Sequence, residues 1–280
     1  MVVQTPLQFD DFQPPDAQRL ARMLRPLRWY FAPTLLGREH VDRQRPALFV
    51  GNHAIFGIID SPLFVSMLYQ QTGVFPRSLG DHFHFDVPGW GKLLLRYGAV
   101  PGTRANCSRL MQAGQHILVF PGGAREVAKR RSEINRLTWK KRTGFARMAI
   151  SHGYDIIPFA SVGCDESVDI VFDGDDFQRS RLGRWLLDRP RVNAALRNGD
   201  LFMPLVHGIG PTSLPRPEPF WFQIGKPIST QPFAGGENDP AVLWQLREQT
   251  AAAINDMIAA LRQRRRQQQV SPLRRFWLRC

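Results

Sequence analysis

The chain has 280 residues, of which 43% are hydrophobic, and it carries a formal net charge of +13. The apolar fraction is typical of a folded protein, and because no window of about 18 residues lacks polar interruptions, we expect no membrane-spanning helix. The three cysteines, Cys107, Cys164 and Cys280, form no CxxC pair. This argues against a disulfide framework or a zinc site and favours a reducing compartment.

The excess positive charge predicts a polyanionic partner. Arginines stand beside large aromatic residues at 25–31 (RPLRWYF) and 274–278 (RRFWL). This combination is typical of a membrane interface, where rings enter the headgroup layer and cations meet lipid phosphate. No RNP-like, zinc-finger or helix-turn-helix pattern is present, so we predict an anionic membrane surface, at its cytoplasmic face, and no nucleic acid.

Three parts are expected along the chain. Residues 1–40 comprise a polar lead-in and an amphipathic, membrane-associating helix over 16–36, capped by Asp16, although the same helix could instead pack on the core. Residues 41–235 form the catalytic domain. Residues 236–280 form a long helix, from 240 to about 266, and a basic tail.

The stretch FVGNHAIFGIIDSPLF at 49–64 is central to the chain. An apolar strand ending at Val50 hands over to Asn52-His53, and Asp60 or Ser61 is placed to cap a helix. A carboxylate can hold one imidazole nitrogen as N–H and leave the other free to accept a proton. The simpler alternative, a loop histidine beside an ordinary helix cap, stays open at this point.

Buried strands alternate with helices across residues 47–162, which predicts an α/β fold with a mostly parallel central sheet flanked by helices. Strands are expected at 47–50, 116–120, 156–162 and 220–224, and helices at 63–69, 92–97, 107–114 and 140–152. Residues 127–138 are strongly basic and are expected to form a mobile loop near the site. The apolar Trp185-Leu186-Leu187 could contact either core or membrane.

Two other motifs carry possible chemistry. His82 and His84 would share one face of a strand, but no third ligand follows, so we predict no metal and a role in a substrate-channel wall. The strand ending at Phe120 runs into Pro121-Gly122-Gly123. Adjacent glycines let backbone N–H groups approach a developing oxyanion, although a tight turn also explains them.

Four blocks in this order carry a family resemblance: NHAIFGIID at 52–60, GAVPGTR at 98–104, FPGGARE at 120–126 and IIPFASVG at 156–163. The chain from 46 to 226 resembles the glycerolipid acyltransferases, which include the lysophospholipid and 1-acylglycerol-3-phosphate acyltransferases. The resemblance is closest to the diacylglycerol-acyltransferase-like branch. The family places four residues between its His and Asp, whereas six separate His53 from Asp60, and Ile58 stands at the usual position. We expect Gly57 to let the loop curl so that Asp60 still reaches His53.

The resemblance implies a role for each candidate residue. His53 is the general base and Asp60 its partner; Gly122, Gly123 and Arg125 bind the acyl donor and oxyanion; Arg104 and Glu126 bind the acceptor; Asn52 and Pro158 are supporting residues. No metal or cofactor is implied, only acyl-CoA or acyl carrier protein as co-substrate.

The implied activity is transfer of a fatty acyl group from a thioester to a hydroxyl of a glycerolipid or related lipid alcohol. Phosphate-accepting members carry a glutamate where Gly122 stands, which favours a neutral acceptor, whereas Arg104 matches a position linked with acceptor phosphate. A lysophosphatidate or lysophospholipid acyltransferase is therefore the alternative. A hydrolase lacks support because there is no GxSxG elbow. The unusual His to Asp spacing leaves a non-catalytic lipid binder open.

Overall fold

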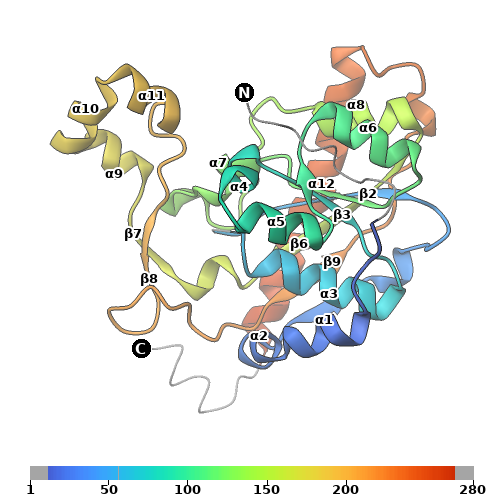
Figure 1. The fold of residues 1–280 in the computed structure, drawn as a ribbon, viewed down its shortest axis with the longest axis horizontal. Coiled ribbons are helices and arrows are strands. Elements are labelled where there is room, and N and C mark those ends of the chain that lie inside the picture. The colour runs from blue at the N-terminus through green and yellow to red at the C-terminus, as the bar shows by residue number, and fades with distance from the viewer. Residues whose placement is uncertain (1–11, 56, 269–280) are drawn as a thin grey trace.

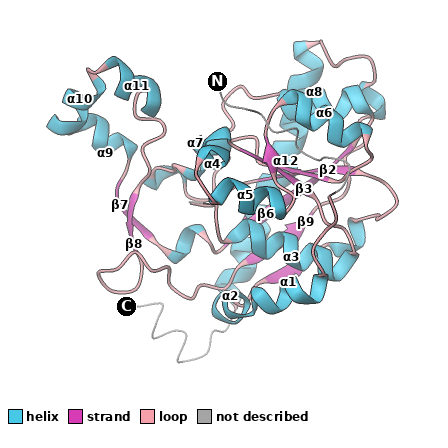
Figure 2. Cartoon of the chain, in the orientation of Figure 1, coloured by secondary structure: helices cyan, strands magenta, loops and turns pink. Residues whose placement is uncertain are grey.

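The computed structural model describes residues 12–55 and 57–268 and contains a seven-stranded sheet (Figures 1 and 2). The strands are β1 (Thr34–Leu36), β2 (Ala47–Gly51), β3 (Arg77–Gly80), β4 (Val100–Pro101), β5 (Ile117–Val119), β6 (Asp155–Val162) and β9 (Trp221–Ile224), in the order β1-β9-β6-β2-β5-β3-β4. From β6 to β4 all neighbours are parallel, while β9 is antiparallel to β6 and parallel to β1. The predicted mostly parallel α/β fold is confirmed.

Helices bury both faces of the sheet. One face packs against α1 (Ala17–Met23), α2 (Arg25–Phe31) and α3 (Asp60–Thr72), and the other against α6 (Arg104–Gln112), α8 (Gly144–His152) and α12 (Pro240–Gln267). The alternation is clear in β2, where Leu48 and Val50 join one core cluster and Ala47 and Phe49 the other. Burial on both faces is typical of a central parallel strand.

The N-terminal prediction is partly wrong, because residues 16–36 form two short helices and a strand rather than one helix. Leu24 ends α1 and begins α2, and Pro26 lies in the first turn of α2. Proline lacks the N–H that a continuous helix would need there and its ring clashes with the preceding turn. The Asp16 cap is confirmed, since its Oδ1 accepts a hydrogen bond from the Arg19 N–H at 2.7 Å.

Residues 81–86 are not the predicted strand. They form α4 (His82–Asp86), whose Asp81 cap accepts from the Phe83 N–H at 3.1 Å, and α5 (Trp90–Arg96) follows. Two residues apart on a helix, His82 and His84 cannot share a face. Within 12–55 and 57–268, no group of three or more His, Cys, Asp or Glu residues could hold a metal ion.

The basic segment 127–138, predicted as a mobile loop near the site, does lie beside the site, but part of it is buried. Lys129, Arg130 and Asn135 are buried, and the acidic partners of the two cations come from residues 165–200. Buried charges are tolerated when they are paired. The partners lie 36 or more residues away in sequence, so local composition gave no sign of them.

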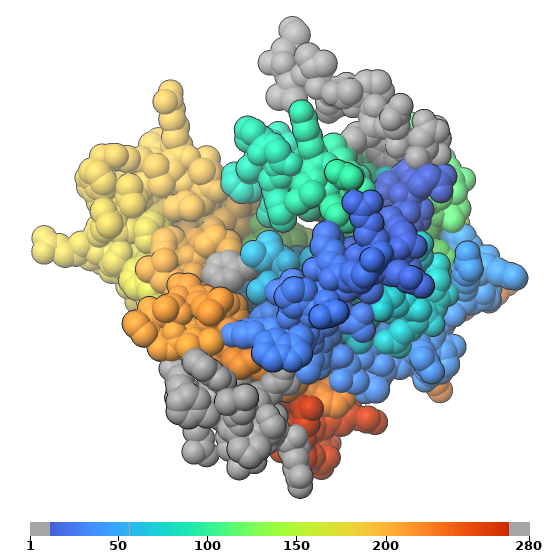
Figure 3. All heavy atoms as spheres, turned by 60° about the horizontal axis from the view of Figure 1, so that its bottom comes forward, coloured from blue at the N-terminus to red at the C-terminus, as the bar shows by residue number. Residues whose placement is uncertain are grey.

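Residues 169–207 form a separate projection, which we call the arm (Figures 1 and 3). Its base is an antiparallel pair, β7 (Asp169–Phe172) and β8 (Leu205–His207), and it carries α9 (Gly174–Arg179), α10 (Arg181–Leu187) and α11 (Pro190–Leu196). The space-filling view shows the arm, in yellow, standing out from one side of the molecule.

The predicted membrane elements have different outcomes. Leu20, Leu24 and Phe31 pack in the core, so the N-terminal helices have a buried face. In the part of the chain that the structure describes, no helix combines the length and apolarity needed to cross a membrane. Most of the predicted lead-in and residues 269–280 of the predicted tail lie outside the described residues.

Candidate active site

The candidate site lies where the parallel strands β2, β5 and β6 end. Asn52 and His53 follow β2, Phe120 follows β5, and Asp165 lies three residues after β6. The carboxyl ends of parallel strands meet at one edge of the sheet, which is where α/β proteins place their ligand sites.

Asn52 fixes the chain as it leaves β2. Its side chain is buried; Oδ1 accepts from the Ser161 N–H at 2.8 Å and Nδ2 donates to the Ser161 carbonyl at 2.9 Å. These two bonds bind the start of the His53 loop to β6. Pro158, the other predicted supporting residue, lies opposite Val50 within the sheet, and its carbonyl accepts from the Gly225 N–H at 2.8 Å, so its contacts are structural.

His53 and Asp60 are brought together despite their longer spacing. Nδ1 of His53 lies 3.5 Å from Oδ2 of Asp60, which is buried and also accepts from the Ala54 N–H at 3.2 Å. Burial alone would raise the pKa of Asp60, but the interaction with His53 and the nearby N–H groups outweigh it, so the pKa is lowered. Asp60 is the first residue of α3, not its cap, so its predicted capping role is wrong.

The imidazole is held on two sides. Its ring stacks on Phe120, with the centroids 3.9 Å apart and the planes at 8°. Gly57, with φ of +64°, lies so close that an added Cβ would stand 2.2 Å from Cε1 and 2.4 Å from Nε2. Only glycine combines this conformation with this approach, so Gly57 is what allows the longer loop to close over the ring.

Glu126 is a second carboxylate beside the imidazole, and it is fully buried. It packs over Gly122, where an added Cβ would meet its Oε2 at 2.2 Å. Neither carboxylate oxygen has a partner at full hydrogen-bond geometry, although Lys129 and His53 are near enough to favour its charged form. Burial dominates and raises the pKa of Glu126 to about 7.

Lys129 and Asp165 complete the cluster, and neither was among the candidate residues of the sequence analysis. The Lys129 ammonium is fully buried and lies 3.1 Å from Oδ2 of Asp165. Burial alone would lower the pKa of Lys129, but Asp165 and Glu126 outweigh it and raise it. Asp165 also accepts from the N–H groups of Ile55 at 2.8 Å and Asn135 at 3.2 Å, so it ties the His53 loop to the basic segment.

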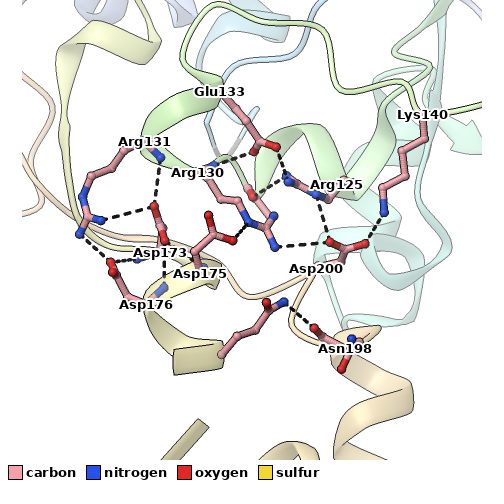
Figure 4. A network of polar contacts seen from close by, with 12 residues as sticks. Arg125, Arg130, Arg131, Glu133, Lys140, Asp173, Asp175, Asp176, Asn198 and Asp200 are labelled. Carbon is pink, nitrogen blue, oxygen red and sulfur yellow. Dashed lines mark hydrogen bonds and ion pairs between the residues drawn. The ribbon is translucent and has the colours of Figure 1, made fainter. Parts of the chain in front are cut away.

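The two glycines and the arginine that were predicted to bind the acyl donor and oxyanion lie in different surroundings. Gly123 has φ of +50°, but its N–H donates to the Phe120 carbonyl at 2.9 Å, whereas Gly122 has an ordinary φ of −67° and precedes α7 (Gly123–Val127). The Arg125 guanidinium donates to the Ala128 carbonyl at 3.0 Å and pairs with Glu133 at 2.5 Å. Because Arg125 belongs to this ion network, shown in Figure 4, we leave it out of the candidate oxyanion site.

A cavity of about 520 Å³ adjoins the cluster. Phe120, which carries the His53 ring on its face, also lines the cavity, and three cationic residues, Arg104, Lys141 and Arg142, line it as well. The cavity reaches Asp81, where the α4–α5 hairpin begins. That hairpin exposes several large apolar side chains: Phe83, Val87, Trp90 and Leu93.

Comparisons with known proteins point to a family. The family model described as Acyltransferase matches residues 33–162, which include His53, Asp60 and Glu126. Over this segment, just under half of its length, the chain is similar to the acyltransferase family. It is 27% identical over 245 residues to Phytyl ester synthase 1, chloroplastic, from Arabidopsis thaliana, a match that covers 82% of this chain and 34% of that protein.

Two further matches are with a sequence relative and with a solved structure of similar fold. The chain is 25% identical over 268 residues to Diacylglycerol O-acyltransferase 2A from Umbelopsis ramanniana, covering 88% of this chain and 72% of that protein. The fold is similar to the crystal structure of the 1-acyl-sn-glycerophosphate acyltransferase PlsC from Thermotoga maritima, with a TM-score of 0.52 and 17% identity over 88% of this chain and 79% of that one. The chain spans about a third of the length of the Arabidopsis relative.

Replacing Lys129 by methionine is expected to lower the free energy of unfolding by about 3 kcal/mol, because Asp165 would stay buried without its cation. Lys226→Met, at an exposed lysine, is the control and should change it by less than about 0.5 kcal/mol. Urea unfolding measures both. Equal small losses in the two variants would contradict the buried pair.

Glu126→Gln tests the raised pKa. Burial raises the pKa of Glu126 from its ordinary value of 4.5 to about 7. The folded state is therefore most favoured below pH 4.5, and it loses stability as the pH rises through about 7. The wild type should therefore lose roughly 3 kcal/mol relative to Glu126→Gln between pH 4.5 and 8. Unfolding curves at several pH values give the free energy of unfolding, and the difference between the wild type and Glu126→Gln should grow as the pH rises. The difference between the wild type and the exposed-site variant Glu248→Gln should not change with pH.

Proposed function

We propose that the chain is an O-acyltransferase that moves a fatty acyl group from a thioester to a lipid alcohol. The observation that carries the proposal is the His53 imidazole, which faces the buried Asp60 carboxylate at 3.5 Å and stacks on the ring of Phe120, a residue of the cavity wall. An oriented imidazole beside a carboxylate is the arrangement required of a general base.

The proposed reaction uses both imidazole nitrogens. Asp60 holds Nδ1 as N–H, so Nε2 accepts the proton of the acceptor hydroxyl while the hydroxyl oxygen attacks the thioester carbonyl carbon. The carbonyl oxygen gains the negative charge, near the predicted donor Gly122. The intermediate then collapses, the C–S bond breaks, and the imidazolium returns its proton to the departing thiolate. The thioester is already activated, so the proposal requires no metal and no further cofactor.

Two energetic contributions are needed. General base catalysis increases the reaction rate by about 10²- to 10⁴-fold, so stabilisation of the oxyanion must supply a further large increase in rate. The cluster around His53 supports the first contribution, because the lowered pKa of Asp60 keeps that carboxylate charged next to the imidazolium that forms. The position of Glu126 beside His53 makes it a second acid–base group of the same cluster.

A neutral lipid alcohol is the acceptor that we favour. Phosphate-accepting members of the family that the chain resembles carry a glutamate at the position of Gly122. The names of two sequence relatives also refer to phytyl esters and diacylglycerol. The exposed apolar side chains of α4 and α5 beside the cavity are suited to a lipid. A phosphorylated acceptor such as lysophosphatidate is the alternative, favoured by Arg104 in the cavity wall.

The donor would be acyl-CoA or acyl carrier protein. Of the basic residues between 129 and 147, Lys129 and Arg130 are buried in ion pairs, whereas Lys141 and Arg142 line the cavity with Arg104. These three are the residues we propose for the donor phosphates. We further propose that the enzyme works at the cytoplasmic face of an anionic membrane.

His53→Ala is expected to lower the turnover of acyl transfer at least about 100-fold, because the general base is lost. Asp60→Asn should also lower it, since an amide cannot stabilise the imidazolium. Labelled acyl-CoA or acyl carrier protein would be incubated with a long-chain isoprenoid alcohol, diacylglycerol or 1-acylglycerol-3-phosphate, and the product identified.

The same assay separates the alternatives. A hydrolase would consume the thioester without an alcohol, and a lipid binder would consume none. Retained transfer by His53→Ala, with the wild-type melting temperature, would refute the proposed site.

Gly57→Ala tests the closed loop. The added Cβ would displace the His53 ring, and a misplacement of about 1 Å costs on the order of 100-fold in rate. Gly235→Ala is the matched control, because Gly235 has φ of +83° and nothing within 4 Å of an added Cβ. It carries the same backbone strain of about 1–2 kcal/mol and should keep the wild-type turnover. Similar turnover in both variants would argue against a role for the close approach.

A further inference from the structure

The arm presents apolar side chains that it does not use for its own packing. In α10, Leu182 is 63% exposed and Trp185 is 52% exposed. The interior of the arm is built from other aromatic residues: Phe177 stacks on Phe202 with centroids 4.4 Å apart, and Phe172 meets the same ring edge-on. Leu182 and Trp185 are three residues apart on the helix and so lie on one face.

This apolar face is surrounded by positive charge. Residues 177–197 contain six arginines and one acidic residue, a net charge of +5, and all six arginines are exposed: Arg179, Arg181, Arg184, Arg189, Arg191 and Arg197. The Arg189 guanidinium lies 3.6 Å from the centroid of the Trp185 ring. Such a concentration of one sign on a small projection favours association with an anionic partner.

The arm is fixed to the body by ion pairs (Figure 4). Arg130 pairs with Asp175 at 2.5 Å, and Arg131 pairs with Asp176 at 2.6 Å. After α11, Asp200 contacts Arg125 at 3.5 Å and also pairs with Lys140. Asp175, Asp176 and Asp200 are thus used at the base of the arm, and the arginines at 179–197 remain on its outer part.

The base of the arm also contacts the His53 loop. Ile55, two residues after His53, is buried in one cluster with Val168, which precedes β7, and Val206, which lies in β8. A surface that holds the arm would therefore hold the His53 loop at a defined place relative to that surface.

We propose that the arm binds an anionic bilayer surface, with Leu182 and Trp185 entering the headgroup layer and the surrounding arginines meeting lipid phosphate. The charge complementarity and the exposed tryptophan together favour lipid over an acidic protein, because interfacial binding uses apolar insertion and cationic attraction at the same time. This inference rests on the proposed function only in that a lipid enzyme must meet a lipid surface.

The test is partitioning of the full chain onto vesicles of phosphatidylcholine with 30% phosphatidylglycerol, measured by flotation. Each arginine near such a surface contributes roughly a fivefold factor, so Arg181→Gln with Arg184→Gln and Arg191→Gln should weaken binding about 100-fold. Leu182→Ala with Trp185→Ala should weaken it about tenfold through lost apolar burial.

A matched control removes the same charge elsewhere. Arg38, Arg43 and Lys226 are exposed near the opposite ends of the strands, beside β1, β2 and β9, and their replacement by glutamine should weaken binding by less than about threefold. Equal losses in the control and arginine variants would overturn the proposal, as would unchanged binding of the arm variants. Loss of binding only to an acidic protein, with vesicle binding intact, would overturn it too.

The outcome is separable from that of the acyltransferase proposal. His53→Ala should bind vesicles as the wild type does, and the arm variants should keep the wild-type turnover on detergent-dispersed substrates. A chain that binds vesicles through the arm but transfers no acyl group would sustain this inference and refute the proposed activity.

Discussion

The arrangement of the site depends on one buried ion pair, Lys129 with Asp165. Asp165 also holds the backbone of Ile55 and Asn135, so a single carboxylate joins the His53 loop to the basic segment and to the end of β6. Burying these charges costs free energy that each partner alone could not recover. Removing either partner would therefore leave the other charge buried without its counter-ion.

The sequence was sufficient for the repetitive features and for residues whose signals are local. The parallel strands follow from apolar runs, the long final helix from Asp239-Pro240 and its periodicity, and the pairing of His53 with Asp60 from the glycine in the intervening loop. Lys129 and Asp165 could not be foreseen, because a lysine in a basic segment appears solvated until its distant acidic partner is known. The break at Pro26 shows the reverse case, in which a local signal was present and outweighed by helical periodicity.

The ion network of Figure 4 pairs cations near the site with acidic residues of the arm. Acidic residues of the arm neutralise Arg130 and Arg131, which belong to the segment next to the site. Other cations line the cavity or lie exposed on the outer arm. Part of the net charge of +13 is thus placed where anionic groups of a donor or a lipid would be met.

Phe120 has a consequence for inhibition. Phe120 carries the imidazole on its ring and also belongs to the cavity wall, so a molecule in the cavity that displaces Phe120 would displace the base as well. Compounds that fill this space need no group aimed at histidine to disturb proton transfer.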